Sequence, residues 1–162
     1  MYRLEFGVEH RGCVVNEMSR DLPQVRLICP GGFILGKNNA DEILILDNPT
    51  QADVDAVIQW LEDSPKITEV EVIERTEDKA YVGIMACADP PQGFCSGAVE
   101  RNRCFRIGYE IQEGGVEKWT VGAKHRSYVD ALVEELRTMG ELKYHRVTET
   151  SWAELVDVIA GL

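Results

Sequence analysis

The chain has 162 residues, of which 44% are hydrophobic, and this share is typical of a globular protein rather than a disordered one. It carries 28 acidic and 17 basic residues, for a formal net charge of −11, so the chain as a whole repels the phosphate backbone of nucleic acids. No apolar run approaches the ~18 residues that span a bilayer, and Met1 to Phe6 alternates like a strand rather than a signal peptide. These features predict a cytoplasmic protein that neither crosses a membrane nor binds DNA by itself.

The first half of the chain alternates between strand and helix patterns. We expect helices over residues 13–22 and 50–61. We expect strands over residues 2–8, 25–35, 42–47 and 67–72. The second helix has the clearest pattern, because Thr50 can cap it and acidic Asp53 follows three positions later. Apolar residues then recur with helical spacing from Val54 to Leu61. The order of this half is therefore βαββαβ.

The second half repeats that order. Its expected elements, of which the second and fifth are helices, cover residues 80–86, 97–102, 104–111, 116–121, 126–139 and 142–147. When residues 26–74 are aligned with 101–149 without a gap, nine of the 49 pairs are identical, against about three expected by chance. The identities include Cys29 with Cys104, and Glu42 with Glu117. We interpret the chain as a duplicated unit; the alternative is a coincidence between two amphipathic helices that each precede a strand.

Each βαββαβ unit predicts a four-stranded antiparallel sheet with two helices on one face. The predicted fold is therefore α+β, with tandem ferredoxin-like (ACT-like) modules at residues 1–76 and 77–149. The two sheets either pack face to face or join at their edges. Residues 150–162 are expected to form a C-terminal helix that begins with a capping box. Its candidate contacts with a partner or with an exposed sheet face are Trp152, Leu155 and Ile159.

The five cysteines are odd in number and fit no disulfide framework, so we expect thiols in a reducing compartment. His10 and Cys13 form an H-x-x-C pair at the start of the first helix, where the field of the helix N-terminus lowers the pKa of a thiol. This pair is a candidate soft-metal site, completed by Cys95 or Cys87 from the matching loop of the second module. The alternative is a small buried thiol beside a surface histidine.

The segment from Cys87 to Cys104 begins with a Pro- and Gly-rich loop. Its cysteine spacing differs from the close C-x₂-C of zinc and iron–sulfur sites. The segment is either a ligand-binding or redox loop, with Cys87, Cys95 and Cys104 as candidates, or an ordinary connection. An alternative role for Cys104, and for its repeat partner Cys29, is packing in the core, because free cysteine is among the most buried residue types. The sequence identifies no cofactor and shows no Ser/His/Asp set, so we assign no catalytic residue.

Two motifs and one helix point to a known family. The motifs are His10-Arg11-Gly12-Cys13, followed by a segment that ends in Leu22-Pro23, and the Gly-x-x-x-Trp-Thr-Val strand from Gly115 to Val121. With the helix over 129–136, they resemble the N-terminal sensor region of archaeal transcription regulators of the bacterio-opsin-activator type. Val14 stands where that family has an aromatic residue, and only about a dozen residues follow the resembling region, too few for a helix-turn-helix.

This resemblance implies a regulatory domain that senses a small ligand, a metal ion or a redox signal, and not an enzyme. It implies a homodimer, since DNA readers contact paired half-sites, and DNA binding only through a separate or missing domain. A stand-alone binding or adaptor protein that works through Trp152 and the final helix is the first alternative. A cysteine-dependent enzyme that uses the segment from Cys87 to Cys104 is the second.

Overall fold

The computed structural model of the chain describes residues 1–35, 39–87 and 93–160. Within these ranges the strands are β1 (Tyr2–His10), β2 (Leu27–Leu35), β3 (Asn39–Asp47), β4 (Ile67–Arg75), β5 (Lys79–Cys87), β6 (Phe105–Arg106), β7 (Glu110–Glu113), β8 (Val116–Ala123) and β9 (Gly140–Glu149). The helices are α1 (Val14–Asp21), α2 (Gln51–Asp63), α3 (Cys95–Arg101), α4 (Arg126–Met139) and α5 (Trp152–Ala160). The predicted α+β class is confirmed, and none of the described helices has both the length and the apolar character needed to cross a bilayer.

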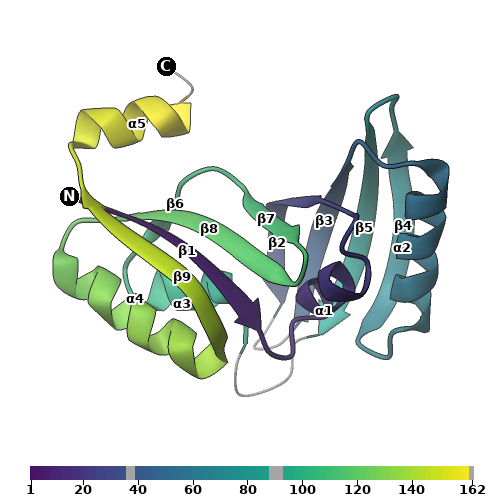
Figure 1. The fold of residues 1–162 in the computed structure, drawn as a ribbon, viewed down its shortest axis with the longest axis horizontal. Coiled ribbons are helices and arrows are strands. Elements are labelled where there is room, and N and C mark those ends of the chain that lie inside the picture. Colours follow the sequence, from purple (N-terminus) through teal and green to yellow (C-terminus); the bar gives the residue numbers. More distant parts are fainter. Residues whose placement is uncertain (36–38, 88–92, 161–162) are drawn as a thin grey trace.

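All described strands belong to one antiparallel sheet with the order β4-β5-β3-β2-β7-β8-β1-β9, and β6 pairs with β8. We call β4, β5, β3 and β2 the first half-sheet, and β7, β8, β1 and β9 the second half-sheet. They meet where β2 pairs with β7, with Leu27 opposite Gln112 and Cys29 opposite Glu110. Figure 1 shows the two half-sheets joined into one continuous surface.

The strand order does not confirm the predicted arrangement of two separate tandem modules. The element order βαββαβ does occur twice, with β6 added, but β1 lies between β8 and β9, and β5 lies between β3 and β4. Each half-sheet therefore takes one inner strand from the other half of the sequence. In β1 and β5, alternate side chains point into the core and to the opposite face of the sheet. This alternation shows which side of a strand is buried, but it does not show which strand pairs with it. The predicted boundary after residue 76 falls between β4 and β5.

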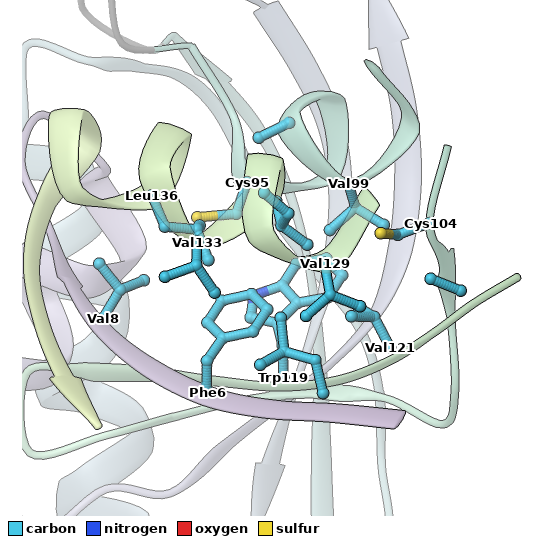
Figure 2. Packing of buried hydrophobic residues seen from close by; sticks show 14 of the residues in the cluster. Phe6, Val8, Cys95, Val99, Cys104, Trp119, Val121, Val129, Val133 and Leu136 are labelled. Atoms are coloured by element: carbon cyan, nitrogen blue, oxygen red, sulfur yellow. The ribbon is translucent and has the colours of Figure 1, made fainter. Parts of the chain in front are cut away.

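Each half-sheet packs against its own helices. In the first, Met18 of α1 and Val57 of α2 lie in an aliphatic core with Leu44 of β3. In the second, α3 and α4 cover a core that contains Phe6 and Trp119, whose stacked rings have centroids 6.3 Å apart. Figure 2 shows this aromatic pair beneath the α4 side chains, with Cys95 and Cys104 at the edge of the cluster.

Helix α1 also connects the two half-sheets, because it contacts β7 and β8 as well as α2. Asn16 Nδ2 donates to Gln112 Oε1 at 2.9 Å, and the Gly115 amide donates to Ser19 Oγ at 3.1 Å. Asn16, Ser19 and Gln112 are fully buried. Polar groups in such surroundings need partners, so these bonds fix the position of α1 on the second half-sheet.

Candidate functional site

The end of β1 and the start of α1 bring His10 and Cys13 to the place where the half-sheets meet. Gly12 has a φ of 81°, a left-handed conformation that suits glycine and turns the chain from one half-sheet into the other. Cys13 is the N-cap residue of α1, and its side chain makes no capping hydrogen bond. The His10 amide donates to Asn16 Oδ1 at 3.1 Å, which holds the strand end against the first turn of the helix.

His10 faces two groups from distant parts of the chain. Its Nδ1 lies 3.2 Å from Glu117 Oε2 and 3.7 Å from Cys95 Sγ. Trp119 Nε1 donates to the other carboxylate oxygen, Glu117 Oε1, at 2.7 Å. His10, Cys95, Glu117 and Trp119 are all less than 5% exposed. They form a buried polar cluster inside an apolar core.

Cys13 completes the cluster from the side of the first half-sheet. One ligand atom from each of His10, Cys13 and Glu117 lies within 4.8 Å of the other two. Cys95 is not in this close group of three, but its Sγ lies 3.7 Å from His10 Nδ1. The four residues line one cavity with one nitrogen, two sulfurs and one carboxylate oxygen. We call His10, Cys13, Cys95 and Glu117 the seam cluster.

The seam cluster lines a small cavity of about 30 Å³, which we call the inner cavity. Its wall comes from β3 and β5 of the first half-sheet, from β1, β7 and β8 of the second, and from the first residues of α1 and α3. Cys87, Glu42 and Glu110 also line it. A space of this size holds one water-sized species.

A larger outer cavity of about 620 Å³ lies beside it. The two cavities share Glu42, Ser96, Glu110 and Trp119 in their walls. The guanidinium of Arg106 also lines the outer cavity, where it lies over the Trp119 ring, 5.4 Å from the centroid, and donates to the carbonyl of Pro30 at 2.6 Å. The two cavities are therefore separated by shared carboxylate and aromatic groups.

The three carboxyl groups around the cavities differ in protonation. Burial, followed by the negative charge of Glu117, raises the pKa of Glu42 to about 7 and raises the pKa of Glu110 well above its usual range. Burial pushes the pKa of Glu117 upward too, but hydrogen bonds from His10 and Trp119 and the charge of His10 outweigh it, so this pKa is lowered. Glu117 is therefore ionised in the core, whereas its neighbours Glu42 and Glu110 favour the protonated form.

The thiols respond to the same environment. Burial, followed by the negative charges of Glu117 and Glu110, raises the pKa of Cys13 and of Cys95 well above the ordinary range. The expectation that the N-terminus of α1 lowers the pKa of Cys13 is therefore wrong. Loss of hydration disfavours the thiolate by more than the field of a short helix favours it.

A family model described as HVO_2525_N, N-terminal, matches residues 3–142 of the chain. The chain belongs to the HVO_2525_N family. This is a family of archaeal proteins. The matched range contains all four residues of the seam cluster and every residue that lines the inner cavity. No curated protein and no solved structure matches the chain.

In this HVO_2525_N member the structure brings together three residues that the sequence singled out, His10, Cys13 and Cys95. The alternative of a surface histidine is wrong, since His10 is 3% exposed. Cys87 also reaches the inner cavity, whereas Cys104 lines the outer cavity and donates to the carbonyl of Asn102. Residues 88–92 of the intervening loop lie outside the described residues.

The structure describes the side chains of two of the three candidate contact residues on the final helix. Trp152 is 49% exposed and stacks on Phe105 with centroids 5.9 Å apart, and Leu155 is buried. The side chain of Ile159 lies outside the described residues. The predicted capping box is confirmed, because the Glu154 amide donates to Ser151 Oγ and the Ser151 amide donates to the Glu154 carboxylate.

Sequence reasoning missed Glu117 as a member of the site, although two signals pointed to it. Glu117 alternates with Trp119 and Val121 on β8, so it is an acidic residue on the buried side of a strand. It is also identical to its repeat partner Glu42. An ionisable residue on an apolar strand face requires a buried partner, and here that partner is His10.

Proposed function

We propose that the chain is a regulatory sensing domain whose ligand binds in the cavities between the two half-sheets. The observation that carries this proposal is the composition of the inner cavity, whose wall and polar groups come from both half-sheets. A ligand that touches both half-sheets binds some relative positions of the half-sheets more tightly than others. Such a difference in affinity is what allows a ligand to shift a conformational equilibrium.

The connection between β1 and α1 supplies the mechanical link. His10 ends a strand of the second half-sheet, and Cys13, three residues later, begins a helix in the core of the first. Any group that draws Cys13 toward His10 and Glu117 acts directly on this connection. Helix α1 transmits the change to β7 and β8 through its buried contacts with Gln112 and Gly115.

The protonation state of the thiols supports sensing over a cysteine-dependent enzyme. A cysteine nucleophile reacts as the thiolate, which a lowered pKa provides. Burial raises the pKa of Cys13, Cys29 and Cys95, so each is held as the thiol when the cavity contains no cation. Such thiols suit a site that becomes charged only when a ligand arrives.

The regulatory target proposed here is transcription, as the resemblance to bacterio-opsin-activator-type regulators implies. The net charge of −11 is consistent with DNA contact through another domain or chain. The description of the matching family as an N-terminal region fits a sensing part placed before other sequence. The homodimer and the cytoplasmic location remain predictions.

A test in the native host compares transcript levels in four strains: wild type, a deletion, Glu117→Gln, and the surface control Glu134→Gln. Glu134 is exposed on α4, so its substitution leaves the seam cluster untouched. We expect the deletion and Glu117→Gln to change the same group of transcripts, while Glu134→Gln matches wild type at equal protein abundance. A deletion strain with unchanged transcripts would refute transcriptional regulation.

A further inference from the structure

We infer that the seam cluster binds one divalent transition-metal ion of borderline softness, with Zn²⁺ as the reference case, through His10, Cys13, Cys95 and Glu117. The identification of this ion as the sensed signal rests on the proposed function, whereas the binding site itself rests only on the arrangement of the four side chains.

The distances suit such an ion. Zinc binds sulfur at about 2.3 Å and nitrogen or oxygen at about 2.0–2.2 Å, so the ligands of a tetrahedral site lie roughly 3.3–3.8 Å apart. His10 Nδ1 lies 3.2 Å from Glu117 Oε2 and 3.7 Å from Cys95 Sγ, and Cys13 joins His10 and Glu117 within 4.8 Å. Closing the set around an ion requires Cys13 Sγ to move toward the other three ligands.

The ring of His10 directs one nitrogen, Nδ1, at the other members of the seam cluster. His10 Nδ1 faces the cluster, whereas Nε2 is buried and has no hydrogen-bond partner among the described residues. The polar contacts of the ring are therefore directed entirely toward Glu117 and Cys95.

Glu117 is already oriented as a ligand. Trp119 Nε1 donates to Oε1 at 2.7 Å, which leaves Oε2 directed toward His10. Hydrogen bonds of this kind from outside the ligand set fix the geometry of metal-binding carboxylates. Trp119 itself is held by stacking on Phe6 in the core of the second half-sheet.

The donor atoms around the cavity also suit a cation. The thiols of Cys13, Cys87 and Cys95 and the carboxyl groups of Glu42, Glu110 and Glu117 line the inner cavity, where His10 is the one basic side chain among the lining residues. A divalent ion replaces three protons: M²⁺ binds two thiolates, one carboxylate and a neutral imidazole, so the two thiol protons and the proton of the charged His10 ring leave to solvent. The two sulfur ligands favour Zn²⁺ or Co²⁺ over Mg²⁺ or Ca²⁺.

The test is titration of the full chain with Co²⁺ under reducing conditions. We expect one equivalent per chain, with thiolate-to-cobalt charge-transfer absorption in the near ultraviolet and ligand-field bands of a tetrahedral ion in the visible. Added Zn²⁺ should displace the cobalt and abolish both signals. Each ion bound should release about three protons, which a pH indicator in weakly buffered solution measures.

Cys95→Ser and Glu117→Gln should weaken binding by about 10- to 100-fold or more, since each removes a ligand. The matched control is Cys104→Ser, because Cys104 is a buried thiol of the same core that lies outside the inner cavity. It should bind like wild type. Circular dichroism of every variant confirms that the fold is retained.

The inference is overturned if folded Cys95→Ser binds Co²⁺ as tightly as wild type, or if wild type binds neither Co²⁺ nor Zn²⁺. A disulfide between Cys13 and Cys95 that forms under oxidant, in a chain that binds no metal when reduced, overturns the metal site but leaves redox sensing intact. Tight binding in a chain whose deletion changes no transcript upholds the site and refutes the proposed function.

Discussion

The two half-sheets have the same order of elements but contribute differently to the seam cluster. The first half-sheet has an aliphatic core and supplies only Cys13, whereas the second contains the Phe6–Trp119 stack and supplies His10, Cys95 and Glu117. The repeat partners Glu42 and Glu117 show the difference most clearly. The pKa of Glu42 is raised to about 7, while that of Glu117 is lowered, because only Glu117 has a buried histidine beside it.

A repeated order of elements can therefore supply a frame without supplying two sites. The exchanged strand β1 ends in His10, whereas β5 ends in Cys87. Among the described residues, the polar cluster forms where β1 leaves the second half-sheet. We expect the half-sheets to share one folding transition, because each takes an inner strand from the other half of the chain.

The largest expected effect comes from Phe6→Ala, which removes a fully buried ring from the second half-sheet. We expect a loss of about 3–5 kcal/mol in the free energy of unfolding. Urea denaturation can be followed with Trp60 alone, which packs on the first core, or with Trp119 alone, in the second. Both reporters should show the same lowered midpoint. A Trp60 transition that stays at the wild-type midpoint would mean that the half-sheets unfold independently.

Glu117→Gln should lower the free energy of unfolding by about 2–3 kcal/mol in the presence of chelator. The amide retains an acceptor for Trp119 but removes the charged partner of buried His10. Thermal or chemical denaturation at pH 7 measures this loss. The exposed Glu134→Gln is the control, and a loss no larger than in that control would show that the His10–Glu117 pair does not stabilise the fold.

Glu42→Gln, at the equivalent repeat position, should have the opposite sign. Because folding raises the pKa of Glu42 from 4.5 to about 7, the folded state holds its proton more tightly, and stability falls as the pH rises through this range. Glutamine cannot ionise, so at pH 8 with chelator the variant should be about 1–2 kcal/mol more stable than wild type, after allowance for partial exposure. At pH 4.5 the two proteins should be alike. Equal stability at both pH values would contradict the raised pKa.

The smallest expected effect concerns the N-caps of α2 and α4, which occupy equivalent positions in the two halves of the chain. Thr50 caps α2 through a capping box with Asp53, whereas His125, its repeat partner, makes no capping bond to α4. Thr50→Ala should therefore cost about 1 kcal/mol, and His125→Ala no more than about 0.5 kcal/mol. Urea denaturation of the two variants measures both values. Equal costs would show that the capping box contributes nothing.

Several local features could be predicted from the sequence because short-range chemistry fixes them. The helix after Thr50 and the capping box at Ser151 depend on residues within one helical turn, and both formed as predicted. The second βαββαβ order followed from the aligned apolar positions. The H-x-x-C spacing also identified His10 and Cys13, since a chain that turns within three residues keeps both ends close.

The sequence by itself therefore indicated most of the elements, their repeated order and three candidate members of the seam cluster, His10, Cys13 and Cys95. Only the tertiary structure decided that β1 and β5 exchange half-sheets, that Cys95 and Glu117 reach His10 from positions 85 and 107 residues away, and that the pKa of Cys13 rises. The physical reason is that apolar periodicity specifies which side of a strand is buried but not which strand lies beside it. Desolvation depends on those neighbours, and it controls the chemistry of the site.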